Sequence, residues 1–285
     1  MSYLKTVTKS ATYALIALTS LCAAVAQAKE WSTVTIATEA AYEPWNMTLP
    51  GGGIGGFEPD LMKDLCTRIK LQCNLQAQDW DGMIAGLQVR KFDMLMDAIV
   101  ITPEREKVIA FSIPYASTQG VLVAVDKGLI GGAGPSGQIA KLTGDAAHDK
   151  PTIDALRTLV KGKSIGIQSG TAYTQFIEDN FKDIATIREY KKSGEHVMDL
   201  LAGRIDFAFD DVTFFSSILD KPEYQAIAMV GPKIGGSIWG PGEALAFRQS
   251  DPDLKAKFDD ALRAALADGT VKTLSQKWFK TDITP

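Results

Sequence analysis

The stretch "LQVRKFDMLMDA" (residues 87–98) has a near-repeat later in the chain, "LAGRIDFAFDDV" (residues 201–212). Both contain a helix end, a basic residue, an aspartate, a short and mostly apolar strand, and a terminal acid. Each copy predicts a strand with a carboxylate at its carboxyl end: Asp97 in the first, Asp210 and Asp211 in the second. Open α/β sheets bind ligands at that end. Two ordinary βα units with acids at exposed strand ends would show the same spacing, so this alternative stays open.

Strand-like and helix-like patterns alternate on both sides of these copies. Positions 61, 62, 65, 66 and 69 are apolar, which is the spacing of one helix face, and Thr102 followed by Pro103 predicts the start of another helix. The predicted segments are strands at 33–39, 93–101 and 121–125; helices at 58–71, 80–89 and 102–111; strand, turn and helix within 164–181; helix, turn and strand within 195–211; and two helices broken at Gly269 within 251–279. Such alternation predicts an α/β fold with mixed or parallel sheets covered by helices. The Gly-rich stretch 126–150 is predicted to be a surface insertion of little structure that holds no site.

Residues 1–28 have the features of a secretory signal peptide. Lys5 and Lys9 precede a short apolar run, and small residues end the segment at Ala28. No other stretch is long and apolar enough to span a bilayer, so we expect a soluble, exported product. The formal charge of the whole chain is −4, and this segment contains two lysines and no acid. The remainder is therefore still more acidic, which excludes nucleic acid as an expected partner.

Two cysteines remain outside the signal segment, Cys66 and Cys73, seven positions apart. In an oxidising compartment this spacing predicts a local disulfide.

A metal site is not expected, because His148 and His196 lie far from the cysteines and from each other in sequence. Neither histidine has a nucleophile motif nearby, so the sequence predicts no hydrolase. The stretch "GGGIGG" (51–56) formally fits a nucleotide-binding motif, but Pro50 separates it from any strand, and a Gly-rich hairpin is the better interpretation.

Several residues have side chains suited to a small charged ligand. In "IATEAAYEPWN" (36–46) a strand ends at Glu39, with Tyr42, Pro44 and Trp45 shortly after it, and a carboxylate with two aromatic rings suits a cation. Arg105, in the first turn of a helix, could clamp a carboxylate, although a surface ion pair with a neighbouring glutamate is the more ordinary role. The turn "QSGTAY" (168–173) could hold an anion on backbone N–H groups or be a plain helix N-cap. Trp80 precedes a helix, where an aromatic ring usually packs in the core.

Taken together, these patterns resemble the polar amino-acid-binding family of periplasmic solute-binding proteins, the receptors of ABC importers. The branch that the chain resembles contains the lysine/arginine/ornithine, histidine, octopine and nopaline receptors, whose members have a similar Cys66/Cys73 spacing. The matching stretches, in the family's order, are "IATEAAYEPWN" (36–46), "GFEPDLMKDLCTRI" (56–69), "DWDGMIAGLQVRKFDMLMDAIVITPEREKVIAFSIPY" (79–115), "IGIQSGTAY" (165–173), "LAGRIDFAFDD" (201–211) and "ADGTVKTLSQKWF" (267–279).

The resemblance implies a two-lobed periplasmic-binding-protein fold, with two hinge strands and a ligand cleft between the lobes. Lobe 1 would comprise 29–116 and 236–285, and lobe 2 with the hinge segments 117–235. Hinge closure would bury the ligand. The family's receptors are expected to be monomers without cofactor or catalytic activity, and they deliver their ligand to an ABC permease in the inner membrane.

The same resemblance implies the roles of the site residues. Arg105 matches the carboxylate clamp and Asp211 the acid that takes the ligand's α-ammonium. The ligand-binding positions that we predict are Glu39, Tyr42, Trp80, Asp97, Ala98, Val100, Arg105, Gln168, Thr171, Ala172, Tyr173 and Asp211. Among them, Glu39, Tyr42 and Trp80 match the side-chain pocket, with Trp80 stacking on the ligand.

Four positions depart from the family's pattern and bear on the identity of the ligand. Val100 replaces a common serine, Asp97 replaces serine or alanine, and Ala172 and Tyr173 replace polar residues. The acid at position 211, which the opine receptors lack, favours a free α-ammonium and hence a basic amino acid of the arginine, lysine, ornithine or histidine type. An arginine-derived opine is the alternative ligand, and a dehydratase-like enzyme on the same fold is a more distant alternative.

Overall fold

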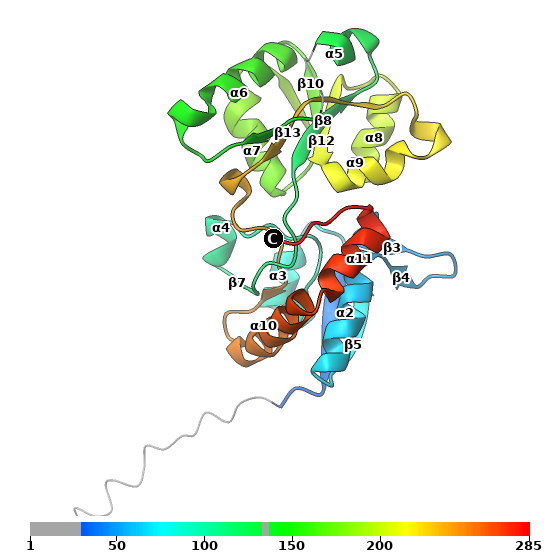
Figure 1. The fold of residues 1–285 in the computed structure, drawn as a ribbon, viewed down its shortest axis with the longest axis vertical. Coiled ribbons are helices and arrows are strands. Elements are labelled where there is room, and N and C mark those ends of the chain that lie inside the picture. The colour runs from blue at the N-terminus through cyan, green and yellow to red at the C-terminus, as the bar shows by residue number, and fades with distance from the viewer. Residues whose placement is uncertain (1–29, 133–136) are drawn as a thin grey trace, which may run out of the picture. The chain divides into compact units, whose positions relative to one another are not determined.

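Two separate β-sheets carry the fold in the computed structural model, which describes residues 30–132 and 137–285 (Figure 1). The predicted signal peptide, 1–28, lies outside the described residues. The first sheet has five strands, in the order β5 (Gln72–Ala77), β1 (Thr33–Thr38), β6 (Met94–Leu95), β14 (Ala246–Phe247) and β7 (Ala110–Phe111). Strand β1 pairs in parallel with β5 and β6, whereas β14 is antiparallel to both of its neighbours. The chain therefore returns to this sheet near its C-terminus.

The second sheet has six strands, in the order β11 (Thr186–Tyr190), β10 (Ser164–Gln168), β12 (Phe207–Asp211), β8 (Gly120–Ala124), β13 (Ala228–Gly235) and β9 (Ile139–Lys141). Strand β10 runs parallel to β11 and β12, and β8 runs antiparallel to β12 and β13. This mixture matches the prediction of mixed and parallel sheets. A small third sheet, the meander β2 (Ala41–Tyr42), β3 (Asn46–Thr48) and β4 (Ile54–Gly55), contains the Gly-rich hairpin. The nucleotide-binding interpretation of 51–56 thus has no support from the backbone.

Helices flank both sheets (Figure 1). They are α2 (Phe57–Arg68), α3 (Met83–Gln88), α4 (Pro103–Glu106), α5 (Lys127–Gly132), α6 (Ala146–Val160), α7 (Ala172–Phe181), α8 (Ser193–Leu201), α9 (Val212–Leu219), α10 (Pro252–Ala267) and α11 (Thr270–Phe279), with short 3₁₀ turns η1 (Pro222–Tyr224) and η2 (Ser237–Trp239). The predicted break between the last two helices is real: Gly269 has φ 81°, a left-handed conformation that glycine adopts without steric cost.

Each large sheet has its own apolar core. On the first sheet, Ile36 of β1 and Leu61 of α2 pack with Phe258 and Leu262 of α10, so the C-terminal helices cover strands from the start of the chain. Figure 1 shows α2 and α11 side by side. On the second sheet, Ile165, Ile177 and Phe207 belong to one buried cluster.

The predicted disulfide is present. Cys66 near the end of α2 and Cys73 in β5 are joined by an S–S bond of 1.96 Å. Since the two elements are neighbours in sequence and in the first sheet's core, the bond fastens a helix to the edge strand beside it.

Three of the predicted segments are wrong in extent. The strand expected over 93–101 contains only Met94–Leu95, because Ala98 has φ 46°, which no strand accommodates. The helix expected over 102–111 comprises only Pro103–Glu106, and Ala110–Phe111 is strand β7. The segment 126–150, expected to lack structure, contains α5, β9 and the start of α6, which also holds His148. Leu129, Ile130 and Leu142 pack against or within the second sheet's core, and this burial orders the segment.

Candidate functional site

One pocket is lined by side chains from both large sheets. The structure brings together all twelve predicted ligand-binding residues: Glu39, Tyr42, Trp80, Asp97, Ala98, Val100, Arg105, Gln168, Thr171, Ala172, Tyr173 and Asp211. Asp210 and Glu243 complete the lining. The sequence placed Asp210 at a strand end but not in the site, and Glu243 was missed. Trp45, which the sequence grouped with Glu39 and Tyr42, is instead fully buried in the first sheet's core.

The acids of the pocket come from strand ends. Glu39 directly follows β1, Asp97 lies two residues beyond β6, and Asp210 and Asp211 end β12. All four side chains are buried, with Asp97 5% and Asp211 3% exposed. The alternative of exposed strand-end acids is therefore wrong, and the expected edge of the sheets is where the carboxylates gather.

Arg105 is the cation of the pocket lining. Its backbone N–H donates to the Thr102 hydroxyl, 3.3 Å away, so the predicted N-cap of α4 is confirmed. Its guanidinium donates to the carbonyl oxygens of Val100 (2.8 Å) and Gly170 (3.1 Å). Within the described chain no carboxylate pairs with it, so the ordinary interpretation as a surface ion pair is wrong. Burial lowers the pKa of Arg105 to about 10, which still leaves it charged at neutral pH.

Trp80 is half-buried at the pocket and does not pack as a fully buried core residue. Its indole N–H donates to the carbonyl oxygen of Ser169 over 3.0 Å, and its ring lies 5.3 Å from the Arg105 guanidinium carbon. This distance is within the range of a cation–π contact. The guanidinium is thus held by two carbonyls and one aromatic ring, and three of its five N–H groups are left over for a ligand.

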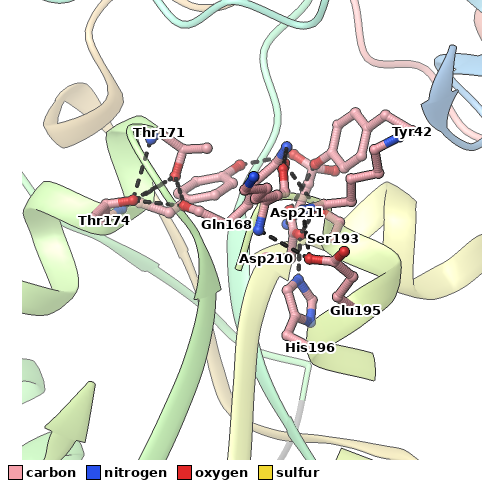
Figure 2. A network of polar contacts seen from close by, with 12 residues as sticks. Tyr42, Gln168, Thr171, Thr174, Ser193, Glu195, His196, Asp210 and Asp211 are labelled. Carbon is pink, nitrogen blue, oxygen red and sulfur yellow. Dashed lines mark hydrogen bonds and ion pairs between the residues drawn. The ribbon is translucent and has the colours of Figure 1, made fainter. Parts of the chain in front are cut away.

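The backbone N–H groups of two predicted ligand-binding residues, Ala98 and Thr171, already have side-chain partners. The N–H of Ala98 donates to Glu58 Oε1 (2.7 Å), and the N–H of Thr171 donates to the Thr174 hydroxyl (3.2 Å). Thr171 and Thr174 form a capping box at the start of α7, as Figure 2 shows. The plain N-cap interpretation of this turn is therefore confirmed.

Asp210 is a structural carboxylate whose oxygens are fully used. Oδ1 accepts from the Tyr42 hydroxyl (2.7 Å) and the Asp211 N–H (2.7 Å). Oδ2 accepts from the Ser193 hydroxyl (2.5 Å) and a ring nitrogen of His196 (2.9 Å). A carboxylate offers about four acceptor sites, so no site remains. Figure 2 shows these side chains converging on Asp210.

The acceptor sites of the Asp211 carboxylate are all occupied as well. Oδ1 accepts from the N–H (2.6 Å) and the hydroxyl (2.5 Å) of Thr213, which makes Asp211 the N-cap of α9. Oδ2 accepts from the hydroxyls of Tyr173 (2.9 Å) and Thr118. Burial raises the pKa of Asp211, although the hydrogen bonds to its carboxylate oppose that effect.

Glu39 and Asp97 keep free acceptor capacity. The Glu39 carboxylate accepts only from Gln168 Nε2, at 3.1 and 3.2 Å, and burial raises its pKa to about 7. Asp97 accepts through Oδ1 alone, from the Glu39 N–H, the Thr38 hydroxyl and the Asn46 amide. Burial, and after it the charge of Glu39, raises the pKa of Asp97 well above its ordinary value.

Glu243 lies on the segment that returns from β13 to β14 and is 4% exposed. Its Oε1 is 2.7 Å from the Thr118 hydroxyl, and its Oε2 has no hydrogen-bond partner. Burial, and after it the charge of Asp211, raises the pKa of Glu243 to about 8. The only sequence signal for it was an isolated acid in the otherwise apolar run "GEALAF" (242–247).

The pocket therefore has five carboxyl groups and one guanidinium in its lining. Buried charge of this kind is costly unless a ligand of opposite charge balances it.

In the part of the chain that the structure covers, no cluster of His, Cys, Asp and Glu could hold a metal ion. Nor does any helix of the described residues have the length and apolarity to cross a membrane.

The chain was compared with known proteins. A model of the bacterial extracellular solute-binding proteins, family 3, matches residues 34–281. The octopine-binding periplasmic protein of Rhizobium meliloti is 39% identical, over 90% of this chain and 94% of that protein. The L-arginine-binding protein of Pseudomonas aeruginosa is 29% identical, over 88% of this chain and 89% of that protein.

A solved structure supports the same grouping. A periplasmic His/Glu/Gln/Arg/opine family-binding protein from Silicibacter pomeroyi, in complex with lysine, superposes with a TM-score of 0.70. It is 27% identical in sequence and covers 88% of this chain and 99% of its own. These matches confirm the predicted two-lobed α/β fold class, while the exact limits of the lobes stay a prediction.

Proposed function

Because the chain belongs to the bacterial extracellular solute-binding proteins of family 3, we propose that it is a periplasmic receptor that captures a basic amino acid and delivers it to an ABC permease. The observation that carries this proposal is the charge of the pocket lining. The lining contains five acids, Glu39, Asp97, Asp210, Asp211 and Glu243, and one cation, Arg105. An acidic pocket with a single guanidinium suits a ligand that has one carboxylate and more than one positive group.

Arg105 supplies the carboxylate end of this site. A guanidinium matches a carboxylate with two parallel hydrogen bonds, and Arg105 has unused N–H groups for them. Its contact with Trp80 fixes the plane of the fork. Without such a partner, burial of the ligand carboxylate would cost several kcal/mol, on the order of the penalty for any unpaired buried ion.

The acids divide between the two positive ends of the ligand. Asp211, at the carboxyl end of β12, supplies the negative charge for the α-ammonium, as the family resemblance implies. Glu39 and Asp97, which have unused acceptor sites, suit a cationic side chain, and the Tyr42 and Trp80 rings border it. This division explains why the pocket has more acids than an α-ammonium alone requires.

Hydrogen bonds across the pocket support capture by closure. Trp80 and Glu39 come from segments next to the first sheet, and they bond to Ser169 and Gln168 at the end of β10 in the second sheet. Tyr42 reaches Asp210 in the same way. A ligand enclosed by both groups of elements is removed from water, which strengthens each charge contact.

An opine is the second candidate, since the octopine-binding protein of Rhizobium meliloti is 39% identical to this chain. An opine has a second carboxylate that needs a second donor group. Arg105 is the single Lys, Arg or His in the pocket lining of the described residues, and the other charged side chains there are acids. The charge balance therefore favours the basic amino acid. Both candidates are ligands of a receptor and require no catalytic group.

Calorimetry tests the proposal directly. The mature protein is titrated with arginine, lysine, ornithine, histidine, octopine and nopaline, after native mass spectrometry has identified any ligand retained on purification. We expect the tightest binding for a basic amino acid. Tighter binding of an opine would replace the ligand assignment, and binding of neither class would refute the receptor proposal for these compounds. Glu223→Gln, an exposed site in η1, is the control variant.

A further inference from the structure

Two acids at the ammonium end of the pocket differ in their free acceptor sites: those of Asp211 are all occupied, whereas Glu243 has an oxygen without a hydrogen-bond partner. Asp211 already accepts from four donors, two on each oxygen. A carboxylate has about four acceptor sites, so a ligand ammonium cannot add a hydrogen bond to Asp211 without displacing one of them. Glu243 lines the same pocket, and its Oε2 is buried with no partner. An unpartnered buried oxygen is uncommon and needs an explanation.

The Thr118 hydroxyl contacts both acids, and its single hydrogen limits how many of the two can be ionised. It is within hydrogen-bonding distance of Asp211 Oδ2 and of Glu243 Oε1. A hydroxyl has one hydrogen and can donate only once. If both acids were ionised, one of these two contacts would join lone pairs. One carboxyl must therefore hold a proton and donate it to the Thr118 oxygen.

That proton belongs on Glu243. Asp211 receives three further hydrogen bonds from Tyr173 and Thr213, all of which stabilise its ionised form. Glu243 has fewer donors: Thr118 contacts Oε1, its own backbone N–H also acts on the carboxyl group, and Oε2 has no hydrogen-bond partner. The consistent arrangement is Glu243 Oε1–H donating to Thr118 Oγ1, and Thr118 Oγ1–H donating to Asp211 Oδ2.

The surroundings of Glu243 favour the proton as well. The titratable groups that face it are Asp211 of β12, Glu58 of α2, Tyr115 of the segment after β7, and Tyr173 of α7. None of these is a cation, and among the described residues no lysine, arginine or histidine forms an ion pair with Glu243. Burial raises the pKa of Glu243 to about 8, in the direction that the hydrogen count requires.

We propose that Glu243 is a further ligand-binding residue, which holds a proton in the empty pocket and exchanges it for the ligand's ammonium group. On capture, the Glu243 O–H bond breaks and the proton leaves to solvent. Glu243 Oε1 then gives up its contact with Thr118, which keeps donating to Asp211, and the carboxylate accepts a hydrogen bond from the ammonium through Oε2. The total charge of the pocket is thereby conserved, since one proton leaves as one cation enters. This inference rests on the proposed function and names a second residue at its ammonium subsite.

Proton release is the decisive readout. Arginine is titrated calorimetrically at pH 7 in buffers of low and high ionisation enthalpy, whose comparison gives the protons released per ligand. With a pKa of about 8, about nine tenths of the Glu243 side chains hold a proton at pH 7. We expect the wild type to release nearly one proton more than Glu243→Gln, and Glu223→Gln to behave like the wild type. Equal release by the wild type and Glu243→Gln would overturn the proposal.

The pH dependence of affinity gives the matching result. When binding releases one proton, affinity rises about tenfold for each unit of pH increase, up to the pKa of the group. Between pH 6 and pH 7, the wild type should therefore gain about tenfold more affinity than Glu243→Gln gains. Glu39 also has a raised pKa, of about 7, and contributes to both proteins alike, so the difference between them isolates Glu243. An unchanged pH slope in the variant would contradict the exchange.

A measurement without ligand separates this inference from the proposed function. NMR of protein labelled with ¹³C at the glutamate carboxyl carbon should show a group that titrates near pH 8. That resonance should be absent from Glu243→Gln and from Glu243→Asp, so that either variant assigns it if the other does not fold. If no basic amino acid binds, the proposed function and the ammonium contact fail together, while the titration still decides whether Glu243 holds the proton. Absence of the resonance overturns the inference even when arginine binds.

Discussion

The Arg105 guanidinium carbon lies 5.3 Å from the centre of the Trp80 ring. The two residues are joined to the same turn of the second sheet, because Trp80 donates to Ser169 and Arg105 donates to Gly170. The cation is therefore oriented before any ligand arrives. A group that is already fixed loses little side-chain entropy on binding, so more of its hydrogen-bond energy contributes to affinity.

Substitution of Arg105 should remove the carboxylate end of the site. We expect Arg105→Ala to weaken the binding of a basic amino acid by about 3 kcal/mol or more, because the ligand carboxylate would be buried without a partner. Arg105→Lys should recover part of the loss, since lysine keeps the charge but not the bidentate fork. Calorimetry measures both variants, and wild-type affinity in Arg105→Ala would exclude Arg105 as the clamp.

Asp211 should be needed for its charge although its oxygens are occupied. Asp211→Asn keeps an effective N-cap for α9, so the fold is expected to survive. The loss of a buried negative charge beside the ligand ammonium should cost about 3 kcal/mol of binding free energy. Thermal unfolding of the ligand-free variant is the control for folding. Retention of full affinity for arginine would show that another acid takes the ammonium.

Glu39 should discriminate between charged and neutral side chains. Glu39→Gln keeps the shape and the contact with Gln168 but removes the charge at the far end of the pocket. We expect weaker binding of arginine and lysine and little change for citrulline, the neutral isostere of arginine. Competition calorimetry with the two isosteres gives the ratio of their affinities. A parallel loss for both compounds would mean that Glu39 only shapes the pocket.

Glu243 should make the folded state less stable as the pH rises. Its pKa is raised from 4.5 to about 8 by burial, so the folded protein binds the proton more tightly than the unfolded chain does. This contribution to stability is fully present below pH 4.5 and is lost as the pH rises towards 8, by at most about 1.4 kcal/mol per pH unit. Glu243→Gln lacks this loss, so its free energy of unfolding should rise relative to wild type between pH 5 and pH 8. Urea denaturation of both proteins at each pH measures the difference, and parallel curves would contradict it.

The Cys66–Cys73 disulfide should matter for stability but not for binding. It closes a loop of seven positions between α2 and β5, for which the chain-entropy model gives about 2 kcal/mol. Cys66→Ala combined with Cys73→Ala should lower the free energy of unfolding by about that amount. Affinity for the ligand should stay the same, since neither cysteine lines the pocket. A change in affinity would reveal coupling between this edge of the sheet and the site.

The sequence by itself determined the α/β class, the helix boundaries at Thr102 and Gly269, the disulfide and the acids at the ends of β1 and β12. These features are local, because residue spacing, helix caps and strand ends each depend on about ten neighbouring positions. The same local signals failed over 93–101, where the Ala98 backbone turns left-handed and donates to Glu58 from another element. They also failed over 126–150, because burial against the second sheet orders that segment.

Only the tertiary structure decided what the acids and Arg105 do. Arg105 has glutamates on both sides in sequence, yet its partners are Val100, Gly170 and the Trp80 ring. Asp211 and Glu243 are alike as residue types, yet one is saturated and the other has an unpartnered oxygen. That distinction depends on Tyr173, which is 38 positions from Asp211, and the link between the two acids depends on Thr118, which is 93 positions from Asp211 and 125 from Glu243. Contacts over such separations arise only when the two segments that cross between the sheets lie together, and no local pattern encodes them.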